Sequence, residues 1–500
     1  MAKSSENLRL ILGLKLRSLR LARGEGLRDV ADRADLSVSY LSELEQGRKY
    51  PKPDKLLRLA ESLEVSYDDL VSVKVTAELG PLKDAVNSGV LREFPFDLFG
   101  LDREDLVRLI SHAPGKSGAL IQSLVEIGRS YDVQVEHFLL SALRAYQQMN
   151  ANYFDELEQS AIDFRLAEGW LPGQPLEESV LQGILEQRWG YQIDTTTIAD
   201  HPELGGFRSA YVEGEMPTLH VNGNLLSVQR AFILAREIGY LQLGLSERAR
   251  TSSWIKVESF AQLLNNFRAS YFAGALLIDR DSLGVELETL FAQPVWDSRR
   301  FLECMARYRA TPEMFLYRLT ELVPRMFGLD KLFFLRFHKR DDRDGVALTK
   351  VFNLSGVPVP YGVGLKEHYC RRWPGLTLLG TSPAATDDSE VIAVQRSRFM
   401  AEDAEFFVVA VGRALTLAAN ARTSVSIGFL MDERFKRRVH FWNDPAVPRA
   451  EVNLTCERCA LGRSECDDRA APPEVHRQQL DQQRQEQALA ELGAISATKA

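Results

Sequence analysis

The sequence predicts a multi-domain protein that is mainly α-helical with α+β parts. The chain has 500 residues, too many for one hydrophobic core, so several domains of about 150 residues each are expected. Apolar residues recur at helical spacing in the first seventy residues and in much of residues 76–168, whereas residues 330–430 alternate short apolar runs with polar turns. The expected order is an all-α head, a helical linker, a middle segment, and an α+β sensor-like domain that ends in a cysteine cluster.

Composition is typical of a soluble globular protein, with 45% hydrophobic and 26% charged residues. No apolar run approaches the ~18 residues that span a bilayer, and the N-terminus MAKSSENLRL is too polar for a signal peptide. We therefore expect a cytoplasmic protein with no membrane partner.

Charge is distributed unevenly along the chain. The net charge is −8, yet residues 1–58 hold 13 Lys and Arg against 8 Asp and Glu. A basic head on an acidic remainder fits a protein that contacts phosphate groups with one end only.

The head reads as a series of short helices. Leucines at helical spacing predict a first helix that ends near Gly24, and Ser37 is a good N-cap for a third helix that Gly47 ends. Asp54 is expected to cap a fourth helix. The predicted ranges are 8–24, 27–34, 38–46 and 54–63, with a short fifth helix opening at 68. Two short helices joined by a tight turn, the second starting in small polar residues, suit entry into the major groove of DNA.

The stretch SVSYLSELEQGRKYPKPDKLLRLAESLEVSYDDL closely resembles the XRE/Cro-like helix-turn-helix family. The resemblance implies that base edges are read near the start of the third helix, that a basic loop after it meets phosphates, and that Arg20 pairs with Glu45. The implied DNA-binding residues are Ser37, Val38, Ser39, Tyr40, Glu43, Arg48 and Lys49. Leu27 departs from the family, which often has Gln there. A protein-interaction domain that has lost DNA binding is the alternative.

In the middle segment, a helix predicted over 228–243 contains QRAFILAREIGYLQLG, which resembles the metal-site helix of the ImmA/IrrE metallopeptidases. There, two His at i and i+4 hold zinc and the Glu between them is the general base. Here the ligand positions are Arg236 and Tyr240, and a guanidinium does not ligate zinc because it stays protonated. The candidates for the third ligand, Asn266 and Arg268, are not acidic. We expect a degenerate zincin-like segment that is not an enzyme, with Glu237 as an ordinary carboxylate paired with Arg236 or Arg230.

Cysteines concentrate near the C-terminus of the chain. Cys456, Cys459 and Cys466 lie within eleven residues, and Cys370 supplies the fourth thiol that a four-thiolate site needs. Such a site holds either zinc or an iron–sulfur cluster, and reduced structural cysteines are the third interpretation. Spacing alone does not choose among them. Cys304, in a helical run, is expected in the core.

The back half also resembles the short-chain fatty acyl transcriptional regulators, through TPEMFLYRLTELVPRMFGLDKLFFLRFHKRDDRDG, HYCRRWPG and VNLTCERCALGRSECDDRAAPP. The resemblance implies a short-chain acyl-CoA ligand and favours a [4Fe–4S] cluster over zinc. A CoA site needs cations for its phosphates and an apolar slot for the acyl chain. The candidate cations are Arg371, Arg372, Arg396 and Arg398.

These inferences predict a transcriptional regulator that responds to a metabolite and binds an inverted-repeat operator as a homodimer. An iron–sulfur redox sensor that does not bind acyl-CoA and a repressor-cleaving peptidase are the alternatives. The expected domains are 1–73 for the helix-turn-helix, 76–168 for the linker, 169–325 for the ImmA/IrrE-like segment, 326–475 for the sensor, and 476–500 for a polar tail, frayed or disordered.

Overall fold

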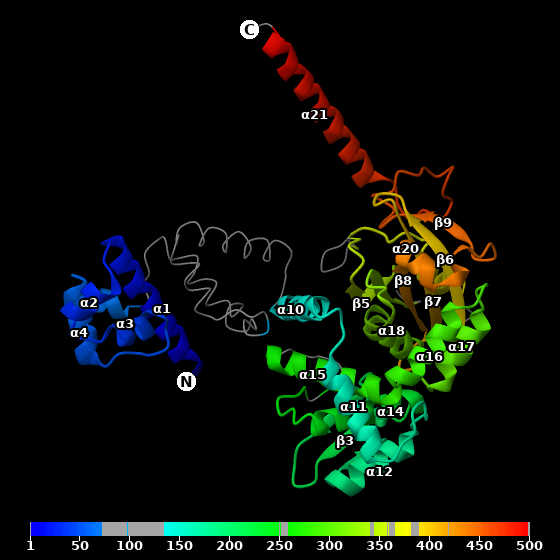
Figure 1. The fold of residues 1–500 in the computed structure, drawn as a ribbon, viewed down its shortest axis with the longest axis horizontal. Helices are drawn as coiled ribbons and strands as arrows, with labels where there is room; N and C mark the ends of the chain where they lie inside the picture. Colours follow the sequence, from blue (N-terminus) through cyan, green and yellow to red (C-terminus); the bar gives the residue numbers. More distant parts are fainter. Residues whose placement is uncertain are drawn as a thin grey trace. The chain divides into compact units, whose positions relative to one another are not determined.

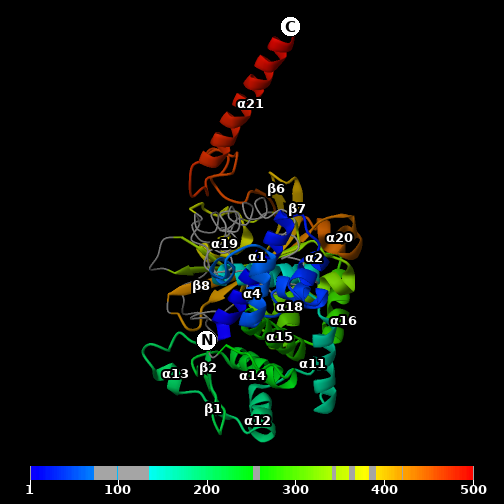
Figure 2. The same cartoon turned by 90° about the vertical axis from the view of Figure 1, so that its left-hand side faces the viewer.

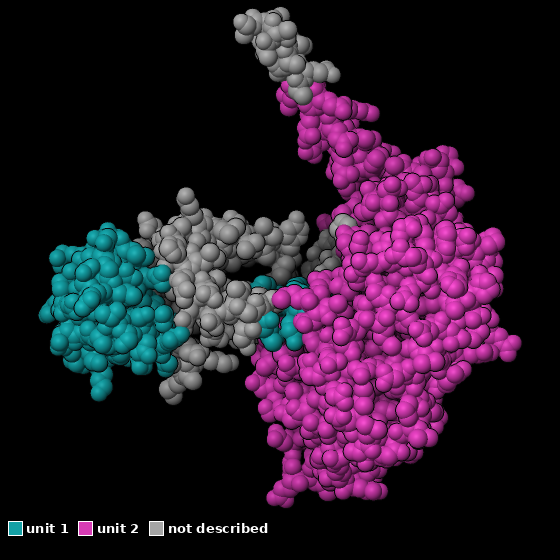
Figure 3. All heavy atoms as spheres, in the orientation of Figure 1, with its two compact units in different colours: residues 1–146 teal, residues 147–500 magenta. Residues whose placement is uncertain are grey.

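A computed structural model describes residues 2–72, 98, 135–249, 251, 259–340, 345–357, 359, 366–381, 390–418 and 420–498. Two compact units divide the chain, residues 1–146 and residues 147–500 (Figure 3). Most of the expected linker, from 76 to 134, lies outside the described residues apart from Leu98. The domain boundaries expected at 169 and 326 both fall inside the second unit.

The head of the first unit consists of five helices (Figure 1). They are α1 (Ala2–Ala22), α2 (Leu27–Arg33), α3 (Val38–Glu45), α4 (Pro53–Ser62) and α5 (Tyr67–Val71). The helical spacing of the sequence is confirmed because its leucines form one core, with Leu16, Leu41, Leu44 and Leu59 almost fully buried. The predicted cap of the fourth helix is wrong by two residues: Lys52 is the N-cap, Pro53 takes the first helical position, and Asp54 lies in the first turn.

The second unit begins within α10 (Val135–Met149), which crosses the boundary between the units. The helices that follow are α11 (Asp155–Ala167), α12 (Glu178–Trp189), α13 (Thr197–Asp200), α14 (Ser227–Gln242), α15 (Phe260–Leu277), α16 (Arg280–Phe291), α17 (Ser298–Arg307) and α18 (Pro312–Phe327). Strands β1 (Gln192–Asp194), β2 (Ser209–Val212) and β3 (Thr218–Val221) form a small sheet in the order β1-β3-β2. The helix expected over 228–243 is α14, shifted by one residue.

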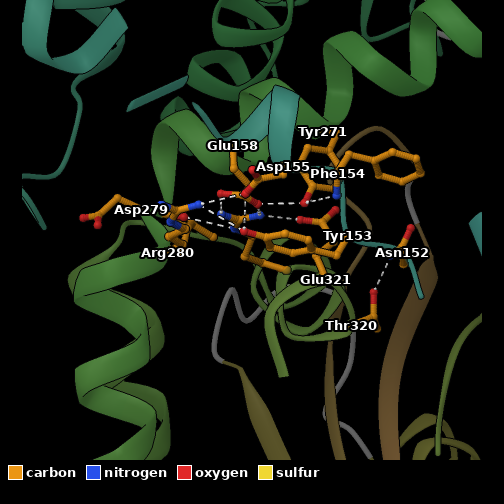
Figure 4. A network of polar contacts seen from close by, with 12 residues as sticks. Asn152, Tyr153, Phe154, Asp155, Glu158, Tyr271, Asp279, Arg280, Thr320 and Glu321 are labelled. Carbon is orange, nitrogen blue, oxygen red and sulfur yellow. Dashed lines mark hydrogen bonds and ion pairs between the residues drawn. The ribbon is translucent and has the colours of Figure 1, made fainter. Parts of the chain in front are cut away.

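A buried ion cluster joins three helices of this unit (Figure 4). The Arg318 side chain is 1% exposed and donates to both carboxylate oxygens of Glu158, at 2.6 and 2.8 Å, and to Glu321 at 2.8 Å. The Tyr271 hydroxyl donates to Glu158 at 2.7 Å. The charges of α11 and α18 are therefore paired inside the core, which fixes the relative placement of these helices with α15.

The rest of the unit is built on a six-stranded sheet in the order β5-β4-β8-β7-β6-β9. The strands are β4 (Leu332–Arg340), β5 (Ala347–Asn353), β6 (Val391–Phe399), β7 (Ala404–Ala414), β8 (Ala421–Leu430) and β9 (Arg449–Val452). All neighbours are antiparallel except β6 and β9. The five strands expected between 330 and 430 are thus confirmed.

Helices cover both faces of the six-stranded sheet. On one face, which we name the α18 face, the Tyr317 ring lies 5.3 Å from that of Phe334 on β4. On the other, the α19 face, the Trp373 ring at the start of α19 (Pro374–Thr381) lies 6.0 Å from Phe337. Because successive side chains of a strand alternate between faces, even-numbered residues of β4 belong to the α18 face and odd-numbered ones to the α19 face.

The chain continues beyond the sheet in three further helical segments: α20 (Glu433–Arg438), the 3₁₀ turn η3 (His440–Asn443) and α21 (Glu474–Thr498). Figures 1 and 2 both show α21 extending away from the sheet. The polar tail is therefore one long helix here. Among the described residues, no helix has the length and apolar character that crossing a membrane requires.

Candidate functional site

Helix α3 presents its first turn to solvent. Ser37 is the N-cap, and its Oγ accepts a hydrogen bond from the Tyr40 backbone N–H at 3.2 Å. Ser37, Val38 and Ser39 are exposed, Val38 to 40%. The geometry leaves these side chains available for a partner, as base reading requires.

Cations border this turn. Arg48 and Lys49 are exposed after the end of α3, and Lys49 Nζ lies 2.7 Å from a carboxylate oxygen of Glu43. Lys55, on α4, places its ammonium 4.1 Å from the centre of the Tyr40 ring. The sequence analysis did not single out Lys55, because only the fold brings the start of α4 beside α3. The signal in the sequence was its place two residues after Pro53, in the first turn of α4.

Two features hold α3 against α1. The Arg20 guanidinium donates to both oxygens of Glu45 at 2.7 and 2.8 Å, and this buried pair confirms the expected link. Gly13 of α1 lies so close to α3 that a Cβ there would meet the Leu44 carbonyl oxygen at 2.5 Å. The side chains that hold α3 are therefore buried and those of its first turn are exposed, an arrangement that suits a rigidly held recognition element.

In the small-sheet region, Glu237 of α14 is 2% exposed. It accepts a hydrogen bond from the Tyr191 hydroxyl at 2.8 Å and is bound through both oxygens by the Arg248 guanidinium. The expected pairing with Arg236 or Arg230 is wrong, since Arg230 pairs with Glu178 at 2.7 Å. Arg248 lies in the segment after α14, where no helical spacing could relate it to Glu237.

The positions that matched zinc ligands are occupied by other contacts. Arg236 donates to Ser209 Oγ at 3.2 Å, and the Tyr240 hydroxyl donates to Asn266 Oδ1 at 3.3 Å. The Arg248 guanidinium lies 4.5 Å from the centre of the Tyr240 ring. Burial, with the neighbouring Glu237 carboxylate, raises the pKa of Tyr191 far above its usual range. An arginine thus supplies the positive charge beside Glu237, and these side chains offer no set of zinc ligands.

Two segments bring the cysteines together. An isolated bridge pairs Tyr369 with Thr455, the Cys370 N–H donates to the Leu454 carbonyl at 3.2 Å, and the Cys456 N–H donates to the His368 carbonyl at 2.8 Å. An ion pair and a hydrogen bond flank this bridge: Arg458 pairs with Glu367 at 2.7 Å, and His368 Nδ1 lies 2.7 Å from a carboxylate oxygen of Glu457.

All four cysteines expected to form a site are buried. Burial and, to a smaller extent, the nearby thiols of Cys456 and Cys459 raise the pKa of the Cys370 thiol to about 11. Cys466 lies in the same loop, which Arg469 ties together by donating to the carbonyls of Cys456 and Leu461. No group of three or more His, Cys, Asp or Glu side chains in the described part of the chain is arranged to hold a metal ion. Cys304 lies in α17, buried in the core as expected.

The four arginines considered for CoA phosphates do not converge. Arg372 donates to the Glu465 carbonyl at 2.6 Å, Arg396 to the Val447 carbonyl at 3.2 Å, and Arg398 to Asp403 at 2.9 Å. Arg371 is half-buried beside Cys370. Arg372, Arg396 and Arg398 are thus bound to three different segments.

A small apolar pocket lies on the α19 face. A water-sized molecule can enter only about 10 Å³ of it. Aromatic and aliphatic side chains form most of its wall, and two serines add hydroxyl groups; the lining comprises Phe333, Leu335, Phe337, Trp373, Pro374, Ser397, Phe399, Val408 and Ser426. The pocket shares Trp373 with the segment that carries Cys370.

Known proteins resemble parts of this chain. A family model described as a helix-turn-helix domain matches residues 11–72, and one described as an IrrE N-terminal-like domain matches residues 192–320. The uncharacterized HTH-type transcriptional regulator y4dJ of Sinorhizobium fredii is 36% identical over 66 residues, which cover 86% of that protein and 13% of this chain. The chain belongs to the HTH-type transcriptional regulators.

Other relatives in this family share the head. The HTH-type transcriptional regulator DdrOP3 of Deinococcus deserti is 44% identical over 57 residues, 11% of this chain and 44% of that protein. The transcriptional regulator ClgR of Mycobacterium tuberculosis is 40% identical over 57 residues, 11% of this chain and 51% of that protein. The chain therefore spans about half the length of these relatives. A solved structure, "Mycobacterium tuberculosis transcriptional regulator", matches with a TM-score of 0.45 and 16% identity over 67% of this chain and 94% of that one.

Proposed function

We propose that this regulator binds double-stranded DNA through α3 and that a metabolite bound by the second unit controls the binding. The observation that carries the first half is the exposed turn of Ser37, Val38 and Ser39, bordered by Arg48 and Lys49. Phosphate contacts from the cations position the helix, and side chains at its start read base edges. A protein that works on chromosomal DNA is expected in the cytoplasm.

Selection of bound sequences from a random DNA pool tests this assignment. A sequence-specific reader enriches one motif, and a homodimer enriches an inverted repeat whose half-sites lie about one helical turn apart. No enrichment of any motif by the intact chain would favour the protein-interaction domain instead.

The metabolite proposed is a short-chain acyl-CoA. The apolar pocket on the α19 face supports it, because a short acyl chain needs an apolar slot with a few polar groups, and this wall of Phe, Trp and Leu carries the hydroxyls of Ser397 and Ser426. Calorimetric titration of the intact holoprotein with propionyl-CoA tests the proposal. No binding would leave the iron–sulfur sensor as the better interpretation.

A substitution pair locates the ligand. Ser426→Val adds volume to the pocket wall and should weaken propionyl-CoA binding. Ser424→Val is the matched control, because Ser424 lies on the same strand and the same face but outside the lining. Equal losses in both variants would place the acyl chain elsewhere.

The metal proposed at the cysteines is a [4Fe–4S] cluster, with zinc as the alternative. The residue type suits either one, because Cys370, Cys456, Cys459 and Cys466 are buried thiols and thiolates are the ligands that both favour; binding would have to draw them into a ligand geometry that the described residues do not show. A bound cluster would supply a redox-sensitive link between the two segments. Protein purified without oxygen should be brown, with iron and sulfide in equal amounts, and Cys459→Ser should bleach it. A colourless protein that contains stoichiometric zinc would show that zinc, not a [4Fe–4S] cluster, occupies the cysteines.

Control of DNA binding follows if the ligand favours one arrangement of the two heads of a dimer. A few kcal/mol of difference in ligand affinity between the arrangements is enough to shift the population.

We infer no peptidase step, because Arg236 and Tyr240 stand where zinc ligands would be needed. Zinc-dependent cleavage of a repressor by the purified chain would contradict this inference.

A further inference from the structure

A row of polar side chains crosses the α18 face of the six-stranded sheet. His338 on β4 lies directly opposite Thr423 on β8, and Thr423 in turn lies opposite Arg413 on β7. Directly opposed residues on neighbouring strands point to the same side of a sheet, with their Cβ atoms about 5 Å apart. The three side chains therefore form one continuous row at the end of the sheet near the start of α18.

This row forms one wall of a partly open pocket, of which about 40 Å³ can be entered by a water-sized molecule. The first turn of α18, with Thr311 and Glu313, forms a second wall, and Arg208 reaches it from the segment before β2. The pocket thus lies between the IrrE-like region and the sheet, both within the second unit, and on the opposite face of the sheet from the apolar pocket.

Two members of the row lack a hydrogen-bond partner within the described residues. Thr423 Oγ1 is buried with no partner, and no hydrogen bond joins the His338 ring to any described residue. A buried hydroxyl without a partner is uncommon and unfavourable. Arg413, by contrast, is oriented by hydrogen bonds from its guanidinium to the Ala414 carbonyl, at 3.2 Å, and to Thr416 Oγ1, at 2.8 Å.

The pocket and its surroundings carry more positive than negative charge. The cations around it are Arg208, Arg336, Lys350 and Arg413, and the carboxylates are Glu313 and Glu390. Arg336 donates to both oxygens of Glu313 at 2.7 and 2.8 Å, and Lys350 lies 3.4 Å from it, so this carboxylate is already paired. Burial, together with Arg336 and Arg208 and against the opposing effect of Glu313, lowers the pKa of His338 to about 4. His338 is therefore neutral at pH 7, with a ring N–H able to donate.

We propose that this pocket binds the oxyanion of a small metabolite, a carboxylate or a phosphoryl group, through Arg413, Thr423 and His338. The guanidinium provides charge-assisted hydrogen bonds, the Thr423 hydroxyl and the His338 ring donate to remaining oxygen lone pairs, and Arg208 adds charge at the mouth. The assignment does not depend on acyl-CoA binding, because it concerns the opposite face of the sheet.

Titration of the intact holoprotein with inorganic phosphate and, separately, with propionate tests the proposal, with chloride as the background anion. Binding of phosphate alone assigns the site to phosphoryl groups, and binding of propionate alone assigns it to carboxylates. Binding of neither would overturn the proposal.

Three variants localise the binding. Arg413→Gln should weaken it by about tenfold or more, and Thr423→Val, which keeps the side-chain shape, by a few-fold. Arg398→Gln is the control, because Arg398 is an exposed arginine of the same sheet, paired with Asp403, and should leave binding unchanged. Binding that survives in both Arg413→Gln and Thr423→Val would also overturn the proposal. If Arg413→Gln does not fold, Thr423→Val decides alone.

Discussion

Side chains at the two ends of α3 have different surroundings, and we propose that those at its start read bases while those after its end contact phosphates. Ser39 lies in the exposed first turn, whereas Arg48 follows the last turn. A phosphate contact adds affinity for any sequence, and a base contact adds affinity for one.

We therefore expect Arg48→Ala to weaken binding to specific and random DNA alike and to lower the salt slope of log K by about 1. Ser39→Ala should change the preferred sequence instead. Binding isotherms at several salt concentrations, on the selected motif and on random DNA, measure both effects. Equal effects of the two variants on both DNAs would mean that α3 is not the reading helix.

Arg248 is the second residue with a testable role. Removing it leaves the 2%-exposed Glu237 without its cation, and an unpaired buried charge destabilises by about 3–5 kcal/mol. We expect Arg248→Ala to lower the free energy of unfolding of the second unit by that order, and Glu237→Gln in the same chain to restore part of it.

Tryptophan fluorescence in urea reports on this unit alone, because all six tryptophans follow residue 147. Arg299→Ala is the control: Arg299 pairs with Glu303 at 2.8 Å, but both are exposed, so the loss should stay below about 1 kcal/mol. Similar losses in both variants would contradict the role given to Arg248.

His338 makes stability depend on pH. Its pKa is about 4 in the folded chain against 6.5 in the unfolded chain, so between these values only the unfolded chain is protonated there. Proton uptake at His338 by the unfolded chain therefore leaves the free energy of unfolding unchanged above pH 6.5 and lowers it as the pH falls from 6.5 towards 4. We expect His338→Gln to reduce the loss of stability between pH 7 and pH 5 by about 1–2 kcal/mol. Urea unfolding at both pH values measures this, with the exposed His201→Gln as control; an unchanged pH dependence would contradict it.

At the scale of helices, close approach decides which glycines matter. Gly13 of α1 leaves no room for a methyl group against the carbonyls of Leu44 and Glu45, so Gly13→Ala must push α1 and α3 apart. We expect a loss of about 1–3 kcal/mol in the head, as for other overpacked sites. Hydrogen exchange at the amides of α3 measures it, since the head has no tryptophan.

Gly183→Ala provides the opposite case. Gly183 lies in α12, where an added Cβ meets nothing nearer than 3.8 Å, so the same change should stabilise by about 0.5–1 kcal/mol. Destabilisation by both changes would mean that helix packing around Gly13 is not the cause.

Elements that depend on local sequence were predictable. The helices of the head and the five strands expected between 330 and 430 follow from hydrophobic period and turn residues. Their bounds were found within about two residues, except that α1 begins at Ala2 rather than at Leu8. The partners of Glu237 and the row of His338, Thr423 and Arg413 were not predictable. Strand order and register place His338 opposite Thr423, 85 positions further along the chain, and no local pattern encodes that pairing.

At the scale of the whole molecule, the head is a small part of an acidic chain. It supplies a modest excess of positive charge, so one head should bind DNA weakly. Two linked heads make the second contact intramolecular and raise the affinity without new contacts. We expect the intact chain to bind a two-half-site DNA at least about tenfold more tightly than a single half-site, measured at equal salt. Equal affinity for both DNAs would contradict the homodimer.

The sequence by itself determined the head, because capping residues, helical periods and the basic loop are local properties of residues 7–72. It also determined that zinc ligands are missing from α14, since ligand chemistry is a property of residue type. Only the tertiary structure decided what replaces the metal, which cysteines lie together, and where a polar pocket forms. The pairing of Arg248 with Glu237, the bridge of Tyr369 with Thr455, and the polar row are all contacts between segments that are separate in the sequence and that only folding brings together.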